Sequence, residues 1–168
     1  MIDDRFELAP DAGERALLTC FLDWHRDVLL RKCTGLTDEQ LRGRAVPTSN
    51  LTLLGLLRHM AGVERWYFQA VIAGDFPGSL YTATDDPDED FNNVDAATGD
   101  ATIDIWRAEV EASRRIAAEH SLDDTGTHPT RGRRYSLRWV FQHMIDEYAR
   151  HNGHADLIRE AIDGETGE

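Results

Sequence analysis

The chain has 168 residues, of which 41% are hydrophobic and 29% charged, so we expect residues 1–168 to bury a core as a single globular domain. Asp and Glu outnumber Lys and Arg by 31 to 18, which gives a formal net charge of −13. A surface of this charge repels nucleic-acid phosphates and anionic lipids, so neither nucleic acid nor membrane is expected as a partner.

The two cysteines and the first residues of the chain indicate a cytoplasmic protein. On one helix Cys20 and Cys33 would lie about 20 Å apart, too far for a disulfide, and free thiols are typical of a reducing compartment. Residues 1–15 are acidic and have no apolar run, unlike a signal peptide. The apolar stretches are also far shorter than the roughly 20 residues that cross a bilayer.

Hydrophobic residues at three- and four-residue steps predict two long helices in the first half of the chain. The first is expected over about 11–33, with Gly35 ending it and Thr37 starting a short helical turn. The second is expected over about 51–73, with Gly74 as its stop.

The stretch 76–100 contains prolines, glycines and the acidic run 85–90, and it predicts a long surface loop. The acidic run is interpreted as a solvated loop. A calcium-binding loop would require a defined ligand spacing with a central glycine, which this run lacks.

Two further helices are expected in the second half of the chain. The third spans about 102–120, and a loop over 125–134 follows it. The fourth begins at Ser136, a favourable N-cap, and continues to about Ile162 before Gly164. With no strand alternation visible, the sequence predicts an all-α four-helix bundle with a long loop between helices two and three. Core packing is expected for the four tryptophans on these helices, which are Trp24, Trp66, Trp106 and Trp139.

The fourth helix carries the pattern with the clearest chemical meaning. His151 continues its apolar stripe, and Glu147 lies one turn earlier, at the spacing that brings two side chains to one face. Burying either side chain without a partner costs several kcal/mol, so a carboxylate and an imidazole that both point into a bundle require an interaction that compensates this cost.

The second helix offers His59 beside its apolar positions. Two imidazoles and a carboxylate from facing helices can hold a divalent ion and leave a coordination position open. The alternative is a core histidine, His151, paired with Glu147 and unrelated to His59. His143 and His154 are rival ligands, but the ends of a ladder from His143 to His151 would be about 12 Å apart, too far for one ion.

Three stretches carry a resemblance to a known family. They are FLDWHRDVLLRKCTGLTDEQL at 21–41, LTLLGLLRHMAGVERWYF at 51–68 and VFQHMIDEYARHNGHADLIREAIDG at 140–164, with HNGHADLIREAIDG the most specific part. The chain resembles the DinB-like superfamily, within the branch of mini-circle proteins. It is similar there to mycothiol-dependent maleylpyruvate isomerases and to thiol S-transferases.

This resemblance implies a four-helix bundle and a divalent metal held by one residue of helix two and two of helix four. Those positions are His59, Glu147 and His151 in this sequence. Zinc is the expected ion, and nickel and manganese remain open because the middle ligand is a glutamate.

The resemblance also implies a metal-dependent transferase or isomerase. It would activate a low-molecular-weight thiol such as mycothiol for attack on an electrophile, with the reacting group a metal-bound water or thiol and not a side chain. Two alternatives stay open: a non-catalytic metal- or ligand-binding stress protein, and a metal-dependent hydrolase. A homodimer is compatible with the family.

Substrate contacts are expected from two groups of residues. The first group is a cluster of arginines at the start of the fourth helix. Positive charge at a helix N-terminus opposes the helix dipole, and this cluster can bind a carboxylate of the thiol or the substrate. The alternative is pairing with the acidic run or with a neighbouring subunit. The arginines of this cluster are Arg131, Arg133, Arg134 and Arg138. Tyr67 and Tyr148 are expected to face the cavity, where a phenol can hydrogen-bond to a substrate.

Overall fold

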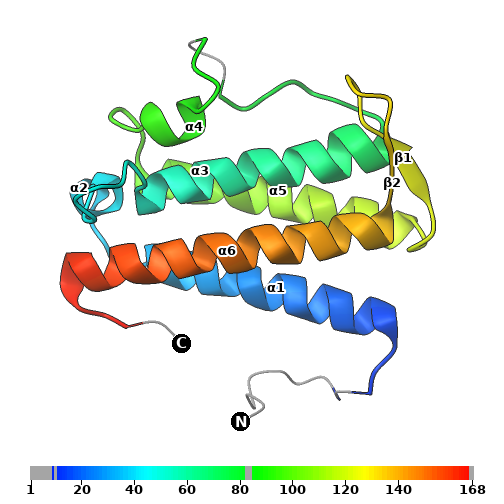
Figure 1. Ribbon diagram of the computed structural model, residues 1–168, viewed down its shortest axis with the longest axis horizontal. Helices are drawn as coiled ribbons and strands as arrows, with labels where there is room; N and C mark the ends of the chain where they lie inside the picture. Colours follow the sequence, from blue (N-terminus) through cyan, green and yellow to red (C-terminus); the bar gives the residue numbers. More distant parts are fainter. Residues whose placement is uncertain (1–8, 10, 82–84, 167–168) are drawn as a thin grey trace.

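Four long helical segments run side by side in the computed structural model, which describes residues 9, 11–81 and 85–166 (Figure 1). They are α1 (Glu14–Cys33), α3 (Leu53–Glu64) with its direct continuation η1 (Arg65–Ala73), α5 (Gly99–Glu119) and α6 (Leu137–Asp163). α6 packs on α1 and α3, and α3 packs on α5. The expected all-α four-helix bundle is confirmed.

Shorter elements occupy the connections. They are α2 (Asp38–Arg42), α4 (Glu89–Asn92), β1 (Thr125–Thr127) and β2 (Arg134–Ser136). The two strands pair antiparallel, with Gly126 opposite Tyr135, and form a hairpin at one end of the bundle (Figure 1). The hairpin occupies the loop predicted over 125–134, since three-residue strands are too short to display an alternating pattern. A second unpredicted element, α4, is a single turn that begins at the end of the acidic run.

The predicted helix ends agree with the structure. Ser136 caps α6 by accepting a hydrogen bond from the backbone N–H of Trp139, and Gly164 ends that helix with a φ of 80°. Thr37 caps α2 through a reciprocal capping box with Gln40. Local sequence therefore defines the ends of these helices.

The second long helix changes its winding at Arg65 and continues as the π-helix η1 to Ala73. Wider helical turns of this kind are rare and occur often at functional sites. The hairpin packs closely against η1: a Cβ atom at Gly126 would lie 1.7 Å from the carbonyl oxygen of Val71. Only glycine is compatible with this approach.

The core between the helices contains a buried polar network. Glu64, which is 0% exposed, accepts hydrogen bonds from Arg26 at 2.8 and 2.7 Å and from the Tyr148 hydroxyl at 2.8 Å. The Tyr148 hydroxyl in turn accepts a bond of 2.9 Å from the indole N–H of Trp106. The polar groups of Glu64, Tyr148 and Trp106 thereby satisfy one another, as the low dielectric of a core requires.

The tryptophans are less uniformly buried than expected. Trp106 is a core residue, whereas Trp24 and Trp66 are half-buried. Trp139 is 38% exposed, so its assignment to the core was wrong. Both Cys20 and Cys33 are free thiols, as predicted. Within the described part of the chain, no helix has the length and apolar composition needed to cross a bilayer.

Candidate functional site

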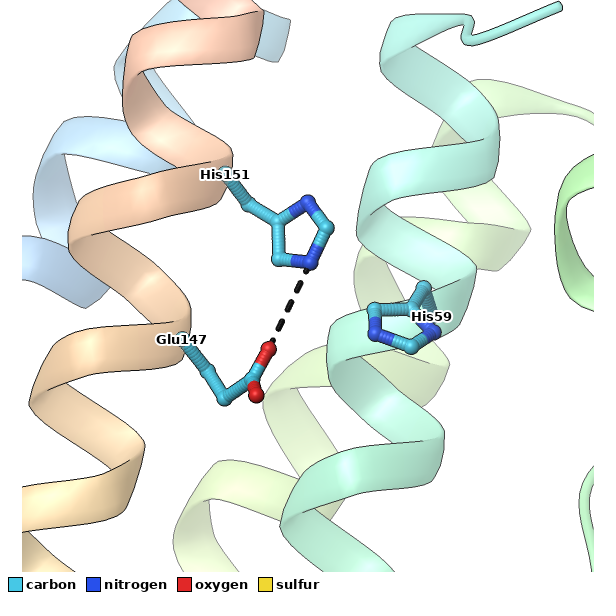
Figure 2. Close-up of side chains that lie close together, drawn as sticks. All are labelled: His59, Glu147 and His151. Atoms are coloured by element: carbon cyan, nitrogen blue, oxygen red, sulfur yellow. Dashed lines mark ion pairs between the residues drawn. The ribbon is translucent and has the colours of Figure 1, made fainter.

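Two facing helices bring together the three side chains predicted as metal ligands. His59 projects from α3, and Glu147 and His151 project toward it from successive turns of α6 (Figure 2). One potential ligand atom from each residue lies within 4.8 Å of the other two. The i, i+4 spacing of Glu147 and His151 explains their shared face, and the packing of α6 on α3 places His59 opposite.

Glu147 lies between two histidines of its own helix. Its carboxylate is 3.5 Å from Nε2 of His151 and 3.6 Å from Nε2 of His143. The side chain of Glu147 is 22% exposed and that of His151 is 11% exposed, so the cluster lies just beneath the surface.

His151 is held in its neutral form. Burial is the main cause that lowers its pKa to about 4, and the nearby His59, His154 and Arg150 lower it further. A neutral imidazole has a free lone pair at pH 7, which is the form that binds a metal. Nδ1 of His154 lies 3.4 Å from Nδ1 of His151, on the opposite edge of the ring from Glu147.

His59 is oriented by two neighbouring residues of α4. Its Nδ1 lies 2.8 Å from Oδ2 of Asp90, and its ring stacks on that of Phe91 with centroids 4.6 Å apart. Because Asp90 engages Nδ1, Nε2 is the nitrogen that remains for a ligand. A carboxylate behind a histidine in this way fixes its orientation and increases its basicity. Asp90 belongs to the run 85–90, so the interpretation of that run as a solvated loop was wrong at this position.

The donor set suits a divalent transition-metal ion. Such ions lie about 2.0–2.2 Å from imidazole nitrogen and carboxylate oxygen, so two ligands of a tetrahedral ion are roughly 3.4 Å apart. The potential ligand atoms of His59, Glu147 and His151 all lie within 4.8 Å of one another, so the three side chains would draw together around an ion. The potential ligand atoms of a rival cluster, His143, Asp146 and Glu147, also lie within 4.8 Å of one another. However, Asp146 is exposed and forms an ion pair of 3.2 Å with Arg150.

Aromatic rings continue from the cluster along α6. Tyr67 of η1 packs against the ring of His143 with centroids 4.6 Å apart, and Trp139 stacks on the same ring at 4.7 Å. Burial is the main cause that raises the pKa of Tyr67, with smaller contributions from Tyr135 and Glu147. Tyr67 is therefore a neutral phenol close to the candidate site.

The other residues expected to contact substrate are placed differently. Tyr148 is fully buried, and its hydroxyl is committed to Trp106 and Glu64, so it offers no free donor to a substrate. Arg138 is ion-paired with Glu14 and Asp123, not with the acidic run 85–90.

The remaining three arginines, Arg131, Arg133 and Arg134, lie in or beside the hairpin with exposed side chains. The guanidinium of Arg133 stands 5.3 Å from the ring centre of Tyr135, and Arg134 donates a hydrogen bond to Thr125. These arginines remain candidates for contact with an anion.

The fold and this cluster define the chain as a four-helix protein with two histidines and a carboxylate gathered between facing helices. Residues 17–164 match the family model of mycothiol S-transferases, and the chain belongs to this family, which is part of the DinB-like superfamily. The resemblance noted in the sequence is thus confirmed.

A solved structure supports the fold. The crystal structure of a conserved protein from Enterococcus faecalis is similar to this one with a TM-score of 0.63 and 15% sequence identity. The match covers 92% of this chain and 99% of that one. No curated protein matches the chain at a significant level.

Proposed function

We propose that the protein transfers a low-molecular-weight thiol, mycothiol or a close analogue, to an electrophilic small molecule, and that this activity requires a divalent ion held by His59, Glu147 and His151. Zinc is the expected ion, with nickel and manganese as alternatives. The observation that carries the proposal is the meeting of these three side chains between α3 and α6 in a chain of the mycothiol S-transferase family.

The protein's own residues supply the ligand set and its orientation. His59 and His151 offer imidazole nitrogens, with His151 in its neutral form and Asp90 holding the ring of His59. Glu147 contributes one negative charge, so the site retains net positive charge when it holds a divalent ion. Such an ion lowers the pKa of a thiol that reaches it, and the thiolate is the reactive form.

The core cysteine, Cys33, is not available as a nucleophile. Cys33 is 2% exposed, and burial raises the pKa of its thiol far above neutral pH. Its sulfur contacts the backbone carbonyl of Leu53 within the core. The exclusion of Cys33 favours a reacting thiol that comes from a small co-substrate, as the family of the chain implies.

The first test measures bound metal by mass spectrometry in protein purified without a metal-affinity tag and reconstituted with zinc, nickel or manganese. We expect about one equivalent in the wild type and its loss in His59→Ala, Glu147→Ala and His151→Ala, each verified as folded by circular dichroism. His120→Ala is the matched control, because that histidine lies at the end of α5 and outside the cluster. Wild-type protein that binds none of the three ions would overturn the metal assignment.

The second test follows loss of an electrophile with and without mycothiol. Loss that requires both mycothiol and metal supports the transferase. Turnover without thiol would identify a hydrolase, and metal binding without turnover of any kind would identify a binding protein.

A further inference from the structure

Four aromatic side chains form a continuous surface beside the candidate metal ligands. This aromatic wall consists of Tyr67, Tyr135, Trp139 and His143. Trp139 stacks nearly parallel on His143, with an angle of 19° and centroids 4.7 Å apart, and its ring lies 4.4 Å from that of Tyr135 and 5.9 Å from that of Tyr67. At 38% exposure, Trp139 presents a large ring to solvent in a place where the core does not require it.

The aromatic wall is continuous with the candidate metal site. His143 is 3.6 Å from Glu147 through its Nε2 atom, and its ring packs on Tyr67. Beside the wall lies a hollow of about 410 Å³, lined by Trp139, His143 and Asp146 among others. The carboxylate of Asp146 is occupied by Arg150, so it does not dominate the charge of the hollow. His143 borders this hollow and also contacts Glu147, so a small planar molecule on the wall would be separated from the candidate metal ligands by one side chain.

Unpaired positive charge borders the same surface. In a chain with a net charge of −13, no carboxylate pairs with Arg131, Arg133 or Arg134 among the described residues. Arg131 and Glu147 are both close enough to Tyr67 to act on its hydroxyl electrostatically. Arg133 stands over Tyr135. Exposed arginines without an ion pair also occur elsewhere on the chain, but Arg131 and Arg133 stand beside aromatic rings, where a guanidinium can bind the carboxylate of a stacked ligand.

A hydrogen-bond donor completes the surface. The hydroxyl of Tyr67 has no hydrogen-bond partner within the described part of the chain, and the phenol keeps its proton because its pKa is raised mainly by burial. A free phenol at this place can donate a hydrogen bond to a carbonyl, nitro or carboxylate oxygen of a bound molecule.

We propose that the aromatic wall, together with Arg131 and Arg133, is the binding site for the electrophile, and that its preferred ligands are planar conjugated molecules that carry a carboxylate. The ring system stacks on Trp139, the carboxylate faces the arginines, and Tyr67 donates a hydrogen bond. This assignment rests on the proposed transferase function, which it extends from the thiol to the acceptor.

Four electrophiles distinguish the contribution of ring stacking to recognition from the contribution of charge. 4-Chloro-3,5-dinitrobenzoate is planar and anionic, and 1-chloro-2,4-dinitrobenzene is planar and neutral. Iodoacetate is flexible and anionic, and iodoacetamide is flexible and neutral. In each case the thiolate sulfur bonds to the carbon that bears the halogen, the carbon–halogen bond breaks, the halide leaves with the electron pair, and the thiol proton passes to buffer.

Each kcat/KM with mycothiol is divided by the rate constant of the uncatalysed reaction, so that intrinsic reactivity cancels. We expect the largest ratio for the planar anionic compound. Trp139→Ala should lower the ratio for both planar compounds about tenfold and leave both flexible compounds unchanged. Arg131→Gln/Arg133→Gln should lower the ratio for the planar anion about tenfold or more, with little effect on the planar neutral compound.

A double variant with the same charge change provides the control. Arg44→Gln/Arg115→Gln removes two exposed arginines that have no ion pair among the described residues and lie outside the aromatic wall. It should leave all four ratios unchanged. Equal ratios for the four compounds in the wild type, or equal losses in the two double arginine variants, would overturn the acceptor assignment while leaving the transferase function intact.

Binding without chemistry makes the two proposals separable. Unreactive 4-nitrobenzoate is titrated into metal-free protein, and tryptophan fluorescence is followed in the wild type and in Trp139→Phe. We expect 4-nitrobenzoate to quench the fluorescence of the wild type and to bind severalfold more weakly to Arg131→Gln/Arg133→Gln. The neutral 4-nitrobenzamide should bind more weakly than 4-nitrobenzoate. Such binding without any thiol transfer would refute the proposed function alone. Absence of binding to the wild type would refute the acceptor site.

Discussion

Asp90 and His59, from different segments of the chain, form a pair in which the carboxylate Oδ2 lies 2.8 Å from the imidazole Nδ1. The next residue, Phe91, stacks on the same imidazole ring. The connection between α3 and α5 therefore takes part in orienting a candidate metal ligand, although none of its residues belongs to the cluster of His59, Glu147 and His151.

Removal of Asp90 should weaken metal binding without abolishing it. We expect Asp90→Ala to raise the dissociation constant for zinc about 10- to 100-fold, because His59 loses the group that fixes its ring. Asp90→Asn should have a smaller effect, since its amide oxygen can still accept a hydrogen bond. Competition with a fluorescent zinc chelator measures both. Asp95→Ala, at an exposed position with the same charge change, should behave as wild type. An equal effect in the Asp95 and Asp90 variants would count against the orienting role.

The hydroxyl of Tyr148 should matter for stability, whereas that of Tyr67 should not. Tyr148→Phe leaves the buried indole N–H of Trp106 without an acceptor and removes one donor to Glu64, so we expect a loss of about 1–3 kcal/mol in the free energy of unfolding. Tyr67→Phe removes a hydroxyl that has no partner among the described residues, and it should change stability by less than about 0.5 kcal/mol. Urea denaturation compares the two variants. A similar loss in both would mean that the core network contributes nothing specific.

Replacement of Gly126 tests the contact between the hairpin and η1. Gly126→Ala places a methyl group against the carbonyl of Val71, so we expect destabilisation by about 1–3 kcal/mol, detected as a lower Tm. Gly153→Ala makes the same change at an exposed position of α6 with no atom within 4 Å, and it should stabilise the protein by about 0.5–1 kcal/mol. A Gly126→Ala variant as stable as the wild type would show that the hairpin moves freely relative to η1.

The two cysteines should differ in reactivity over a wide pH range. The pKa of Cys33 is raised by burial, so its thiol stays protonated from pH 7 to about 10 and should resist N-ethylmaleimide throughout that range. Cys20 is only partly buried and should be modified faster. Mass spectrometry of timed samples distinguishes the two sites, and denatured protein should react at both. Modification of native Cys33 at the rate of Cys20 would contradict its burial.

The sequence was sufficient to predict the parts of the fold and the site that depend on local patterns. Ser136 and Gly164 mark the ends of α6, and the i, i+4 spacing of Glu147 and His151 indicates their common face. The choice of His59 over its rivals required the family resemblance, because spacing within one helix says nothing about which neighbouring helix lies opposite.

Other features depend on contacts between distant segments, which local patterns do not reveal. Asp90 reaches His59 only because α4 folds back onto α3, so in sequence it is one of several acidic residues in a polar run. Trp139 has apolar spacing on α6, yet its ring stacks on His143 at the surface, since the hairpin and η1 supply aromatic neighbours there. The π-helical winding of η1 likewise has no recognised sequence signal in this chain.

The placement of the three candidate ligands on two separate helices has a mechanical consequence. An ion bound by His59, Glu147 and His151 would join α3 to α6 as a crosslink that exists only in the folded protein. Occupancy would then raise the melting temperature in proportion to the logarithm of the free ion concentration. Thermal unfolding would thus report how tightly each ion is held, and so rank zinc, nickel and manganese, before any substrate is known.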